Sequence, residues 1–398
     1  MALVNMKDLL HHAYANRYAV GAFEVVNLEF LRAIIEAAER SRSPVILNIV
    51  EAHFDLFDVD HLMAAVEHAA KRASIPVAIH MDHCASLESV RKAIALGGNS
   101  VMFDASQKNF LVNTEKTREA VAMAHSCGVP VEGEVGYVAG ISSEEGDGEK
   151  DMSIRTSVPE AKAYVERTGV DFLAISIGTV HGRANKIRLD SGLLTRIREN
   201  LDIPFVIHGG TGLTSQQYHK LIDHGVAKIN YFTGMVDLLI RQFKANVSRN
   251  CKTYRDAFAN IQETLVQEVQ NCMQVWRSTG RAAEVLVQCG AWQNVEHVIV
   301  FETESDDPLI VEDMLRKGVQ QLSAIPGVMN VEVGRTADGN GSYRYCWLIR
   351  FANASVIDSY KNHPAYVQYA DTLFRPMAGD RISNDYEMLQ AVRRPRLI

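Results

Sequence analysis

The sequence predicts an α/β protein: a (β/α)₈ TIM barrel followed by a smaller ferredoxin-like α+β domain. Two observations predict the barrel. Short apolar runs alternate with helical patterns through the first part of the chain, and polar residues gather just past several of these runs. A change of pattern near Gly290 predicts the second domain. We therefore expect one domain over residues 1–290 and another over residues 291–398.

Short apolar runs of this kind are typical of buried strands in a parallel sheet. We place the eight barrel strands near residues 20–24, 45–50, 77–81, 100–103, 130–135, 172–175, 205–207 and 227–230. Helical spacing of apolar residues predicts helices over residues 28–40, 62–72, 87–96, 114–125, 159–167 and 215–224. An open doubly wound sheet is the alternative, but such a sheet gives no reason for chemistry to gather at so many strand ends.

The remaining segments predict a loop, a helical region and the elements of a second domain. Residues 140–153 are polar and glycine-rich, which predicts a long mobile loop after the fifth strand. Residues 232–285 are expected to be helical, with a long run over 254–277. The later elements are predicted as strand 296–303, helix 308–323, strands 328–335 and 343–351, helices 355–360 and 365–374, and strand 382–387. This β-α-β-β-α-β order is that of a ferredoxin-like domain.

Composition describes an ordinary soluble protein. Of the 398 residues, 47% are hydrophobic and 22% are charged, and the net charge of −7 argues against a nucleic-acid partner. The first residues lack a signal-peptide pattern, and no apolar run reaches membrane-spanning length, so no membrane partner is expected. The six cysteines are scattered without a CxxC pair, which predicts reduced thiols and a cytoplasmic location.

Three histidines, His83, His181 and His208, follow three different predicted strands. Each alone is more often a packed or hydrogen-bonded side chain. Together, at the carboxyl end of a barrel, they could bind one ion and leave a fourth position open, which is the arrangement of a catalytic zinc site. This pattern predicts a metal-dependent lyase or hydrolase. Asp82 precedes His83, and because neighbouring residues near a strand end point to opposite sides, we expect Asp82 to transfer a proton rather than bind the ion.

Two further segments predict a phosphate site. The run His208-Gly-Gly-Thr-Gly212 follows the seventh predicted strand, and Asn230-Tyr-Phe-Thr-Gly234 follows the eighth. Barrels commonly bind phosphate with backbone N–H groups of these two loops. A tight turn without a ligand is the alternative for each segment.

These motifs, with Glu132-x-Glu134-x-Gly136, Gly178-Thr-x-His-Gly182 and Lys228-Ile-Asn230, resemble the class II, metal-dependent ketose-bisphosphate aldolases, which include the fructose- and tagatose-bisphosphate enzymes. The resemblance covers residues 1–285. It implies a zinc-dependent aldehyde-lyase that cleaves or forms a C–C bond in a phosphorylated ketose through a metal-stabilised enediolate.

The same resemblance implies a role for each matching residue. It implies a zinc ion on His83, His181 and His208, a second or displaced cation on Asp104 and Glu134, and proton transfer to the aldehyde oxygen by Asp82. The half of the substrate that carries the phosphate would be bound by Gly182, Gly209, Gly210, Thr211, Asn230, Tyr231, Phe232 and Thr233.

The chain departs from the family's pattern at four places. Glu24 stands where the family usually has Asn, and Val50 lies near the position where the family usually has Ser or Thr. Phe232 stands where the fructose enzymes have Asp and the tagatose enzymes Ala. In the 140–153 loop the acidic residues are shifted, which leaves Glu144 and Glu145 as candidates for the carboxylate base. These departures imply a different acceptor. They keep two alternatives open: a metal-dependent barrel enzyme with another reaction, such as an isomerase or hydrolase, and a non-catalytic sugar-phosphate-binding protein.

The C-terminal part, residues 295–390, resembles the stress-responsive α/β-barrel (Dabb-like) domains. The matching motifs are His297-Val-Ile-Val-Phe301, Ile325-Pro-Gly-Val328 and Tyr360-x-x-His-Pro364. Such domains usually pair face to face, which implies a homodimer or a larger homo-oligomer. The apolar residues expected on the pairing face are Val298, Val300, Tyr345, Trp347, Ile349 and Ile382.

Overall fold

The computed structural model describes residues 2–54, 57–138, 154–182, 187–249, 251–305, 307–337 and 342–388. The chain divides into two compact units. The first comprises Met1–Val90, Gly98–Ala122 and Pro130–Ala291, and the second comprises Arg91–Gly97, Met123–Val129 and Trp292–Ile398. The second unit therefore includes two short segments that precede the predicted domain boundary.

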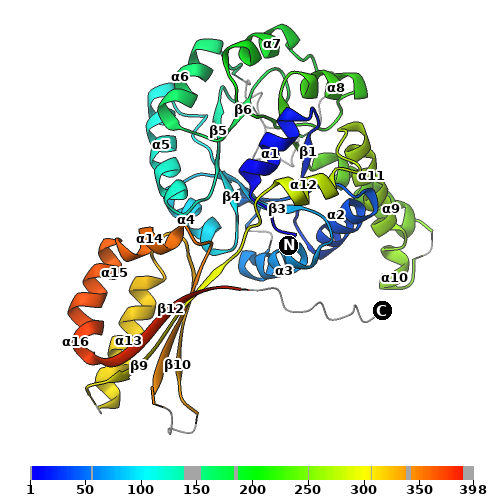
Figure 1. Cartoon of the computed structure of the whole chain (residues 1–398). Helices are drawn as coiled ribbons and strands as arrows, with labels where there is room; N and C mark the ends of the chain where they lie inside the picture. The colour runs from blue at the N-terminus through cyan, green and yellow to red at the C-terminus, as the bar shows by residue number, and fades with distance from the viewer. Residues whose placement is uncertain are drawn as a thin grey trace. The chain divides into compact units, whose positions relative to one another are not determined.

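The first unit is a closed barrel of parallel strands that pair in chain order, with helices around the outside (Figure 1). The strands are β1 (Val20–Glu24), β2 (Val45–Val50), β3 (Val77–Cys84), β4 (Ser100–Phe103), β5 (Val131–Val135), β6 (Phe172–Ile175), β7 (Phe205–Ile207) and β8 (Val226–Tyr231). The helices between them are α2 (Leu28–Ser41), η1 (Glu51–His53), α3 (Val59–Arg72), α4 (Leu87–Ala95), α5 (Phe110–Ser126), α6 (Val158–Thr168), α7 (Ser191–Asn200) and α8 (Ser215–Asp223). Closure of the sheet confirms the predicted barrel and excludes the open doubly wound alternative.

Two α-helices of this unit were not predicted. They are α1 (Met6–Ala15), which precedes the first strand, and α7, whose apolar signal is short because it buries only Leu193, Leu194 and Ile197. The predicted long helix over 254–277 is wrong, because the chain forms α10 (Tyr254–Ala257) and α11 (Ile261–Val275) instead. Asn260 adopts a left-handed conformation with φ of 63°, which ends one helix before the next begins. The remaining helices of this unit are α9 (Thr233–Val247) and α12 (Ala282–Gln288).

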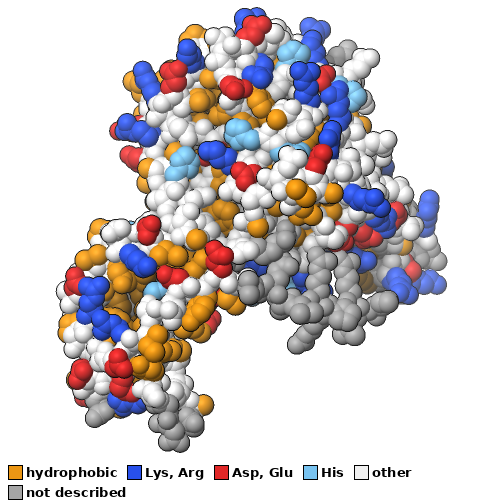
Figure 2. Space-filling model, in the orientation of Figure 1, with side chains coloured by type: hydrophobic (Ala, Val, Ile, Leu, Met, Phe, Trp, Pro, Cys, Tyr) orange, Lys and Arg blue, Asp and Glu red, His pale blue; other side chains and the backbone are white. Residues whose placement is uncertain are grey.

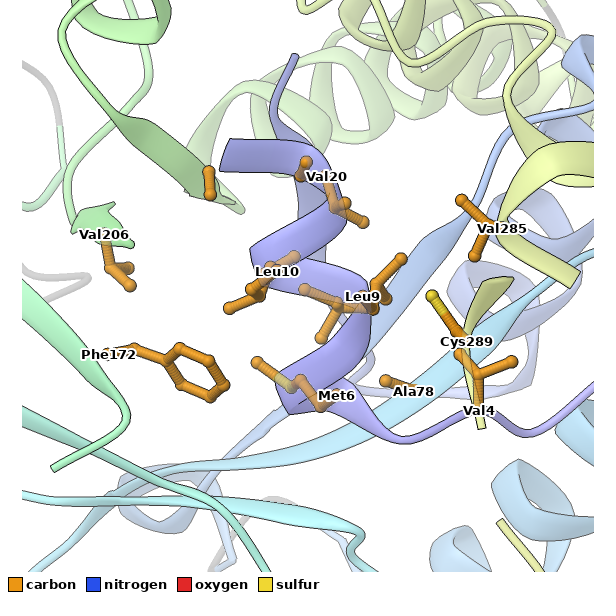
Figure 3. Close-up of a cluster of buried hydrophobic side chains, with 14 of the residues drawn as sticks. Val4, Met6, Leu9, Leu10, Val20, Ala78, Phe172, Val206, Val285 and Cys289 are labelled. Carbon is orange, nitrogen blue, oxygen red and sulfur yellow. The ribbon is translucent and has the colours of Figure 1, made fainter. Parts of the chain in front are cut away.

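Helix α1 covers the amino-terminal end of the barrel. Its Met6, Leu9 and Leu10 are fully buried and pack against side chains at the starts of the strands (Figure 3). The partners from the strands are Val20, Ala22, Ile46, Ala78, Phe172, Ala174, Val206 and Ala227. Because apolar side chains fill this end, the polar residues of the barrel interior lie toward the opposite, carboxyl end.

The second unit has a four-stranded antiparallel sheet in the order β10-β11-β9-β12. Its elements are β9 (Val295–Thr303), α13 (Pro308–Leu322), β10 (Val328–Arg335), β11 (Tyr345–Phe351), α14 (Val356–Lys361), α15 (Pro364–Tyr369), η2 (Ala370–Phe374), α16 (Arg375–Met377) and β12 (Ala378–Glu387). With the first and third strands in the middle, this is the ferredoxin-like arrangement that the element order predicted. The outer surface shown in Figure 2 carries acidic and basic side chains interspersed.

The predicted faces of β11 are reversed. Trp347 and Ile349 were expected on the exposed sheet face, but they are 1% and 0% exposed. Trp347 packs edge-on against Tyr369 of α15, and Tyr345 stacks on Phe301, so all three predicted residues of β11 face the helices. Side chains alternate along a strand, so an error of one residue moves the whole set to the other face. Leu348, which is 38% exposed, lies on the uncovered face instead.

No helix among the described residues has the length and apolar character needed to cross a bilayer.

Truncation of α1 side chains should destabilise the barrel. Leu10→Ala removes a fully buried side chain from the cluster at the amino-terminal end, and we expect a loss of about 2–5 kcal/mol in the free energy of unfolding. Leu28→Ala, at a leucine that is 60% exposed, is the matched control and should change stability little. Urea denaturation of both variants checks this, and equal midpoints would contradict the role given to α1.

Candidate metal and active site

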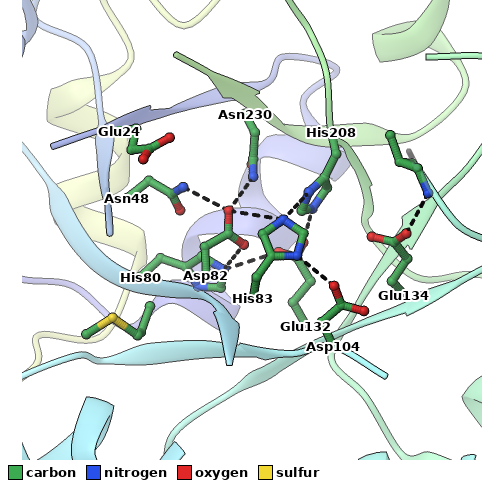
Figure 4. Close-up of polar contacts among 12 residues, drawn as sticks. Glu24, Asn48, His80, Asp82, His83, Asp104, Glu132, Glu134, His208 and Asn230 are labelled. Carbon is green, nitrogen blue, oxygen red and sulfur yellow. Dashed lines mark hydrogen bonds and ion pairs between the residues drawn. The ribbon is translucent and has the colours of Figure 1, made fainter. Parts of the chain in front are cut away.

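The three predicted metal-binding histidines come together at the carboxyl end of the barrel. His83 is in β3, His181 follows β6 and His208 follows β7. Their ring centroids are 4.8–5.6 Å apart, and one nitrogen from each ring lies within 4.8 Å of the other two. Figure 4 shows His83 and His208 side by side in this centre. The fold thus gathers residues that are 125 positions apart in sequence.

Two carboxylates orient two of these rings. His83 Nδ1 lies 2.8 Å from Asp104 Oδ2, and His208 Nε2 lies 2.8 Å from Glu132 Oε1. Each of these nitrogens donates its proton to the carboxylate, because an ionised carboxylate only accepts. The remaining nitrogens, His83 Nε2 and His208 Nδ1, face each other across 3.0 Å. Burial would lower the pKa of His83, but Asp82 and Asp104 raise it to about 10, so a proton on His83 Nε2 lies between the two rings where a metal cation would bind.

The donor set fits a divalent cation. Tetrahedral zinc with bonds of about 2.0–2.1 Å to nitrogen places two ligand nitrogens about 3.3 Å apart, close to the separation found here. His181 contributes Nε2, a buried atom with no hydrogen-bond partner in the described part of the chain. Burial and the neighbouring His83 and His208 hold the pKa of His181 well below its usual range, so this ring is neutral and able to bind a metal.

The backbone of His83 explains why Asp82 and His83 face the same centre. The alternation of a strand would point them to opposite sides, as the sequence suggested. His83, however, has a left-handed φ of 53°, and the pairing of β3 with β4 shifts its register between Met81 and Cys84. As a result His83 Nε2 lies 3.9 Å from Asp82 Oδ2. The expectation of opposite directions is therefore wrong, and the local strain turns both side chains inward.

Asp82 is fixed by two amides rather than by solvent. Its Oδ2 accepts hydrogen bonds from Asn48 Nδ2 at 2.9 Å and from Asn230 Nδ2 at 2.7 Å (Figure 4). Burial alone would raise the pKa of Asp82, but Lys228 and His83 hold it well below the usual range. Its Oδ1 is buried without a hydrogen-bond partner among the described residues. Asp82 is thus an ionised, oriented carboxylate with one oxygen available to a ligand.

A second group of possible ligands consists of His83, Asp104 and Glu134. Burial first, and then the nearby Asp104, raise the pKa of Glu134 to about 8. Its Oε1 accepts a hydrogen bond from the Val138 amide, while Oε2 is buried without a partner in the described residues. This unpaired carboxylate is compatible with a second cation position next to the first.

A buried lysine supplies the positive charge at a third set of possible metal ligands. His80, Asp82 and Glu132 also lie close enough to hold an ion, but Lys228 Nζ is 2.7 Å from Glu132 Oε2 and 3.9 Å from Asp82 Oδ1. Burial would raise the pKa of Glu132, yet Lys228 and His208 lower it to about 2. The ammonium group therefore already supplies the positive charge at this position, and Glu132 stays ionised to orient His208.

The loops after β7 and β8 meet at the predicted phosphate site. Gly209 has a φ of 65°, and a Cβ there would lie 2.1 Å from the Val180 carbonyl oxygen, so only glycine allows this loop to approach the one after β6. Thr211 Oγ1 accepts a hydrogen bond from the Gly234 amide at 3.3 Å. The first residue of α9 is Thr233, and Phe232 before it provides no side-chain cap. The Met235 and Val236 amides bond the Phe232 carbonyl, so an anion at this helix end would compete with Thr211 Oγ1 for the weakly bonded Gly234 N–H.

Other predicted phosphate-site residues have different neighbours. Gly182 has a φ of 77°, and a Cβ at Gly210 would lie 2.8 Å from the Asn230 carbonyl oxygen. The Asn230 side chain binds Asp82. Tyr231 points away from the barrel mouth, since its hydroxyl donates to Glu268 at 2.5 Å. Its assignment to substrate binding is therefore corrected, because the residue after the inward-facing Asn230 must face outward.

Glu144 and Glu145, the candidate bases, and the predicted loop 140–153 that holds them lie outside the described residues.

Sequence reasoning missed part of the buried layer. Asn48, His80 and Lys228 were not assigned roles, and Glu132 was seen only as part of a motif. Each of His80, Glu132 and Lys228 lies two positions before a residue of interest, namely Asp82, Glu134 and Asn230. Side chains two apart on a strand share a face, so the period of two was the signal that could have found them.

Comparison with known proteins agrees with this geometry. The family model described as fructose-bisphosphate aldolase class-II matches residues 4–281, and the stress responsive A/B barrel domain matches residues 295–388. A sulfofructosephosphate aldolase of Alkalicoccus urumqiensis is 34% identical over 285 residues, covering 71% of this chain and 99% of that protein. A fructose-bisphosphate aldolase of Thermus caldophilus is 35% identical, covering 70% of this chain and all of the relative.

Solved structures give the same result. The YdjI aldolase of Escherichia coli K12 aligns with a TM-score of 0.63 at 29% identity, covering 70% of this chain and 99% of that one. A fructose-1,6-bisphosphate aldolase structure from Coccidioides immitis, described as putative, aligns with a TM-score of 0.64 at 28% identity, covering 69% and 97%. The match of most of the chain, together with the three converging histidines, shows that this protein belongs to the class II fructose-bisphosphate aldolase family, a family of lyases.

Proposed function

We propose that this protein is a zinc-dependent aldolase that cleaves or forms a C–C bond in a phosphorylated ketose. The observation that carries the proposal is the facing pair of ring nitrogens, His83 Nε2 and His208 Nδ1, each fixed by a carboxylate behind it. With His181 they form a three-nitrogen donor set of the kind that zinc prefers in catalytic sites. Asp104 and Glu134 are proposed to hold a second cation or a displaced position of the first.

The metal, when bound, would supply Lewis-acid stabilisation of the negative charge that develops on the ketose oxygens. Glu132 and Lys228 hold His208 in the tautomer that leaves Nδ1 free. The loops with Gly182, Gly209 to Thr211 and Thr233 are proposed to bind the phosphate, which fixes the orientation of the substrate relative to Asp82.

Proton transfer at the aldehyde end is assigned to Asp82. In cleavage the ionised carboxylate accepts the proton of the hydroxyl beside the breaking bond, and in condensation it returns that proton to the aldehyde oxygen. The hydrogen bonds from Asn48 and Asn230 keep the carboxylate in one orientation for both directions. Proton abstraction from the carbon of the ketose half is proposed for Glu144 or Glu145.

We also propose that the second unit joins two copies of the chain. The uncovered face of its sheet carries Val298, Val300, Leu348 and Ile382, of which Leu348 and Ile382 are 38% and 49% exposed. The ion pairs Glu296–Arg350 and Glu302–Arg344 lie on the same face. An apolar centre with charges of both signs around it can complement a second copy of itself in a two-fold arrangement. For the whole protein we propose a cytoplasmic location, consistent with its six free cysteines.

Removal of the metal is the first test. A chelator should abolish cleavage of phosphorylated ketoses, and zinc should restore it. His208→Ala should lose both metal and activity while the barrel stays folded. His219→Ala is the matched control, because His219 lies on helix α8 and, among the described residues, its side chain hydrogen-bonds the Val275 carbonyl alone. Metal analysis and circular dichroism of each variant check this. Full zinc occupancy in His208→Ala would contradict the three-histidine site, and zinc without cleavage would favour another reaction such as isomerisation or hydrolysis.

Asp82→Asn should separate proton transfer from metal binding. The variant keeps the size of the side chain and is expected to retain zinc, but turnover should fall about 10²–10⁴-fold, as is typical when one positioned acid or base is removed. Steady-state kinetics and a metal determination on the same variant check this prediction. A wild-type rate would remove Asp82 from the mechanism.

Charge placed on the uncovered sheet face should disrupt the oligomer. Leu348→Glu puts a carboxylate in the middle of the apolar patch, so sedimentation of the full-length variant should show a smaller species than the wild type. Leu309→Glu, at a leucine of α13 that is 77% exposed, is the control and should leave assembly unchanged. An identical oligomeric state in wild type and Leu348→Glu would exclude this face as the interface.

A further inference from the structure

A buried carboxylate–imidazole pair lies at the edge of the site and has no role in the proposed chemistry. Glu24 is the last residue of β1 and His53 the last residue of η1, which directly follows β2. His53 Nδ1 hydrogen-bonds Glu24 Oε1, and Glu24 is only 6% exposed. The His53 ring packs against Phe232 at 5.5 Å, and Phe232 contacts Phe30 at 6.2 Å. The pair is therefore held by its own hydrogen bond and by the packing of Phe232 against the His53 ring.

The rest of the barrel rim is already occupied. The possible metal ligands come from the ends of β3, β4, β5, β6 and β7, and the anion-binding loops follow β7 and β8. Asp82 is hydrogen-bonded to Asn48 of β2 and to Asn230 of β8. The part of the rim beside Asp82 that remains free is the carboxyl end of β1 and β2. Because Asp82 is assigned to the aldehyde oxygen, the aldehyde half of the substrate must extend over this part.

Glu24 is oriented to contact that half. Its carboxyl lies in the same centre as Asn48 and Asp82 (Figure 4), and both Asp82 and His83 influence it electrostatically. While Oε1 is held by His53, Oε2 accepts no hydrogen bond within the described residues. An acceptor oxygen that is not already hydrogen-bonded can accept from a hydroxyl group of a bound molecule.

The pair cannot balance a phosphate group. At neutral pH a hydrogen-bonded carboxylate and imidazole carry a net charge of zero or minus one. The position of the shared proton between them does not change this net charge. In the described structure no lysine or arginine pairs with Glu24, and Lys228, the cation nearest Asp82, is bound to Glu132. Within the described residues, a phosphate on the aldehyde half would lie beside Glu24 and Asp82 with no lysine or arginine to compensate its charge, and like charges in contact disfavour binding.

We propose that Glu24, positioned by His53, determines specificity for the aldehyde half of the substrate and selects a neutral, hydroxylated aldehyde over a phosphorylated one. The substrate class is then a ketose that carries a single phosphate, on the half bound by the loops after β7 and β8. This inference rests on the proposed aldolase function and names the substrate class of the same site. His53 is a positioning residue, and Glu24 is the residue that touches the substrate.

The experiment measures condensation of dihydroxyacetone phosphate with three aldehydes: glyceraldehyde, glyceraldehyde 3-phosphate and propanal, which lacks a hydroxyl. The zinc-loaded wild type should prefer glyceraldehyde over each of the others at least tenfold in kcat/KM. Glu24→Gln, which removes the charge, should reduce the ratio of kcat/KM for glyceraldehyde to kcat/KM for glyceraldehyde 3-phosphate at least tenfold. Glu24→Ala, which removes the acceptor, should reduce the ratio of kcat/KM for glyceraldehyde to kcat/KM for propanal at least tenfold.

Two further readouts separate specificity from other roles. Exchange of the dihydroxyacetone phosphate α-proton with solvent, measured without aldehyde, should be unchanged in both variants, as should bound zinc. Asp385→Asn is the matched control, since Asp385 Oδ1 lies 2.6 Å from His297 Nδ1 in a carboxylate–imidazole pair of the second unit. It should leave all preferences unchanged.

Several results would overturn the inference. They are equal use of glyceraldehyde and its phosphate by the wild type, an unchanged ratio in Glu24→Gln, or a tenfold loss of proton exchange, which would place Glu24 on the ketose half. A wild type that neither exchanges the proton nor condenses any aldehyde would instead refute the aldolase function itself.

Discussion

The contact on which the site depends is the approach of two ring nitrogens, His83 Nε2 and His208 Nδ1, to 3.0 Å. Burial would lower the pKa of His83, but Asp82 and Asp104 raise it to about 10, so a proton on Nε2 bridges the two rings. The contact exists because Asp104 and Glu132 hold the opposite nitrogens as donors, and because the barrel strands hold those carboxylates. The fold therefore holds two ligand nitrogens in position, and a metal cation would take the place of the proton between the rings.

Charge balance leads to the same conclusion. Four carboxylates, Asp82, Asp104, Glu132 and Glu134, are largely removed from water around this centre, whereas Lys228 is the buried amine that contacts them within the described residues. Unpaired buried charge is strongly unfavourable, and one visible result is the raised pKa of Glu134. A divalent cation bound as proposed would supply positive charge at this centre. The apolar side chains of α1 fill the amino-terminal end of the barrel, so the polar layers lie in the half of the barrel that opens to the substrate.

Much of the architecture was predictable because it depends on local pattern. Five of the eight barrel strands have the predicted limits, since each is a short apolar run bounded by polar or glycine-containing turns. The three histidines were found because each follows such a run. The errors arose where the pattern was weak or its phase ambiguous. Asn260 divides a helix that looks continuous, and the faces of β11 were exchanged because alternation gives two sets without saying which one the helices cover.

The sequence by itself determined the fold class, the family and the side chains available at the strand ends, because period and motif spacing are properties of the chain alone. Only the tertiary structure decided which of these side chains touch. It placed His83 and Asp82 in one centre through a left-handed backbone, turned Tyr231 outward, and assigned Lys228 to Glu132 and Glu24 to His53. The Lys228–Glu132 and Glu24–His53 pairings join different elements of the barrel, so their distances, charges and burial are fixed only when the sheet closes.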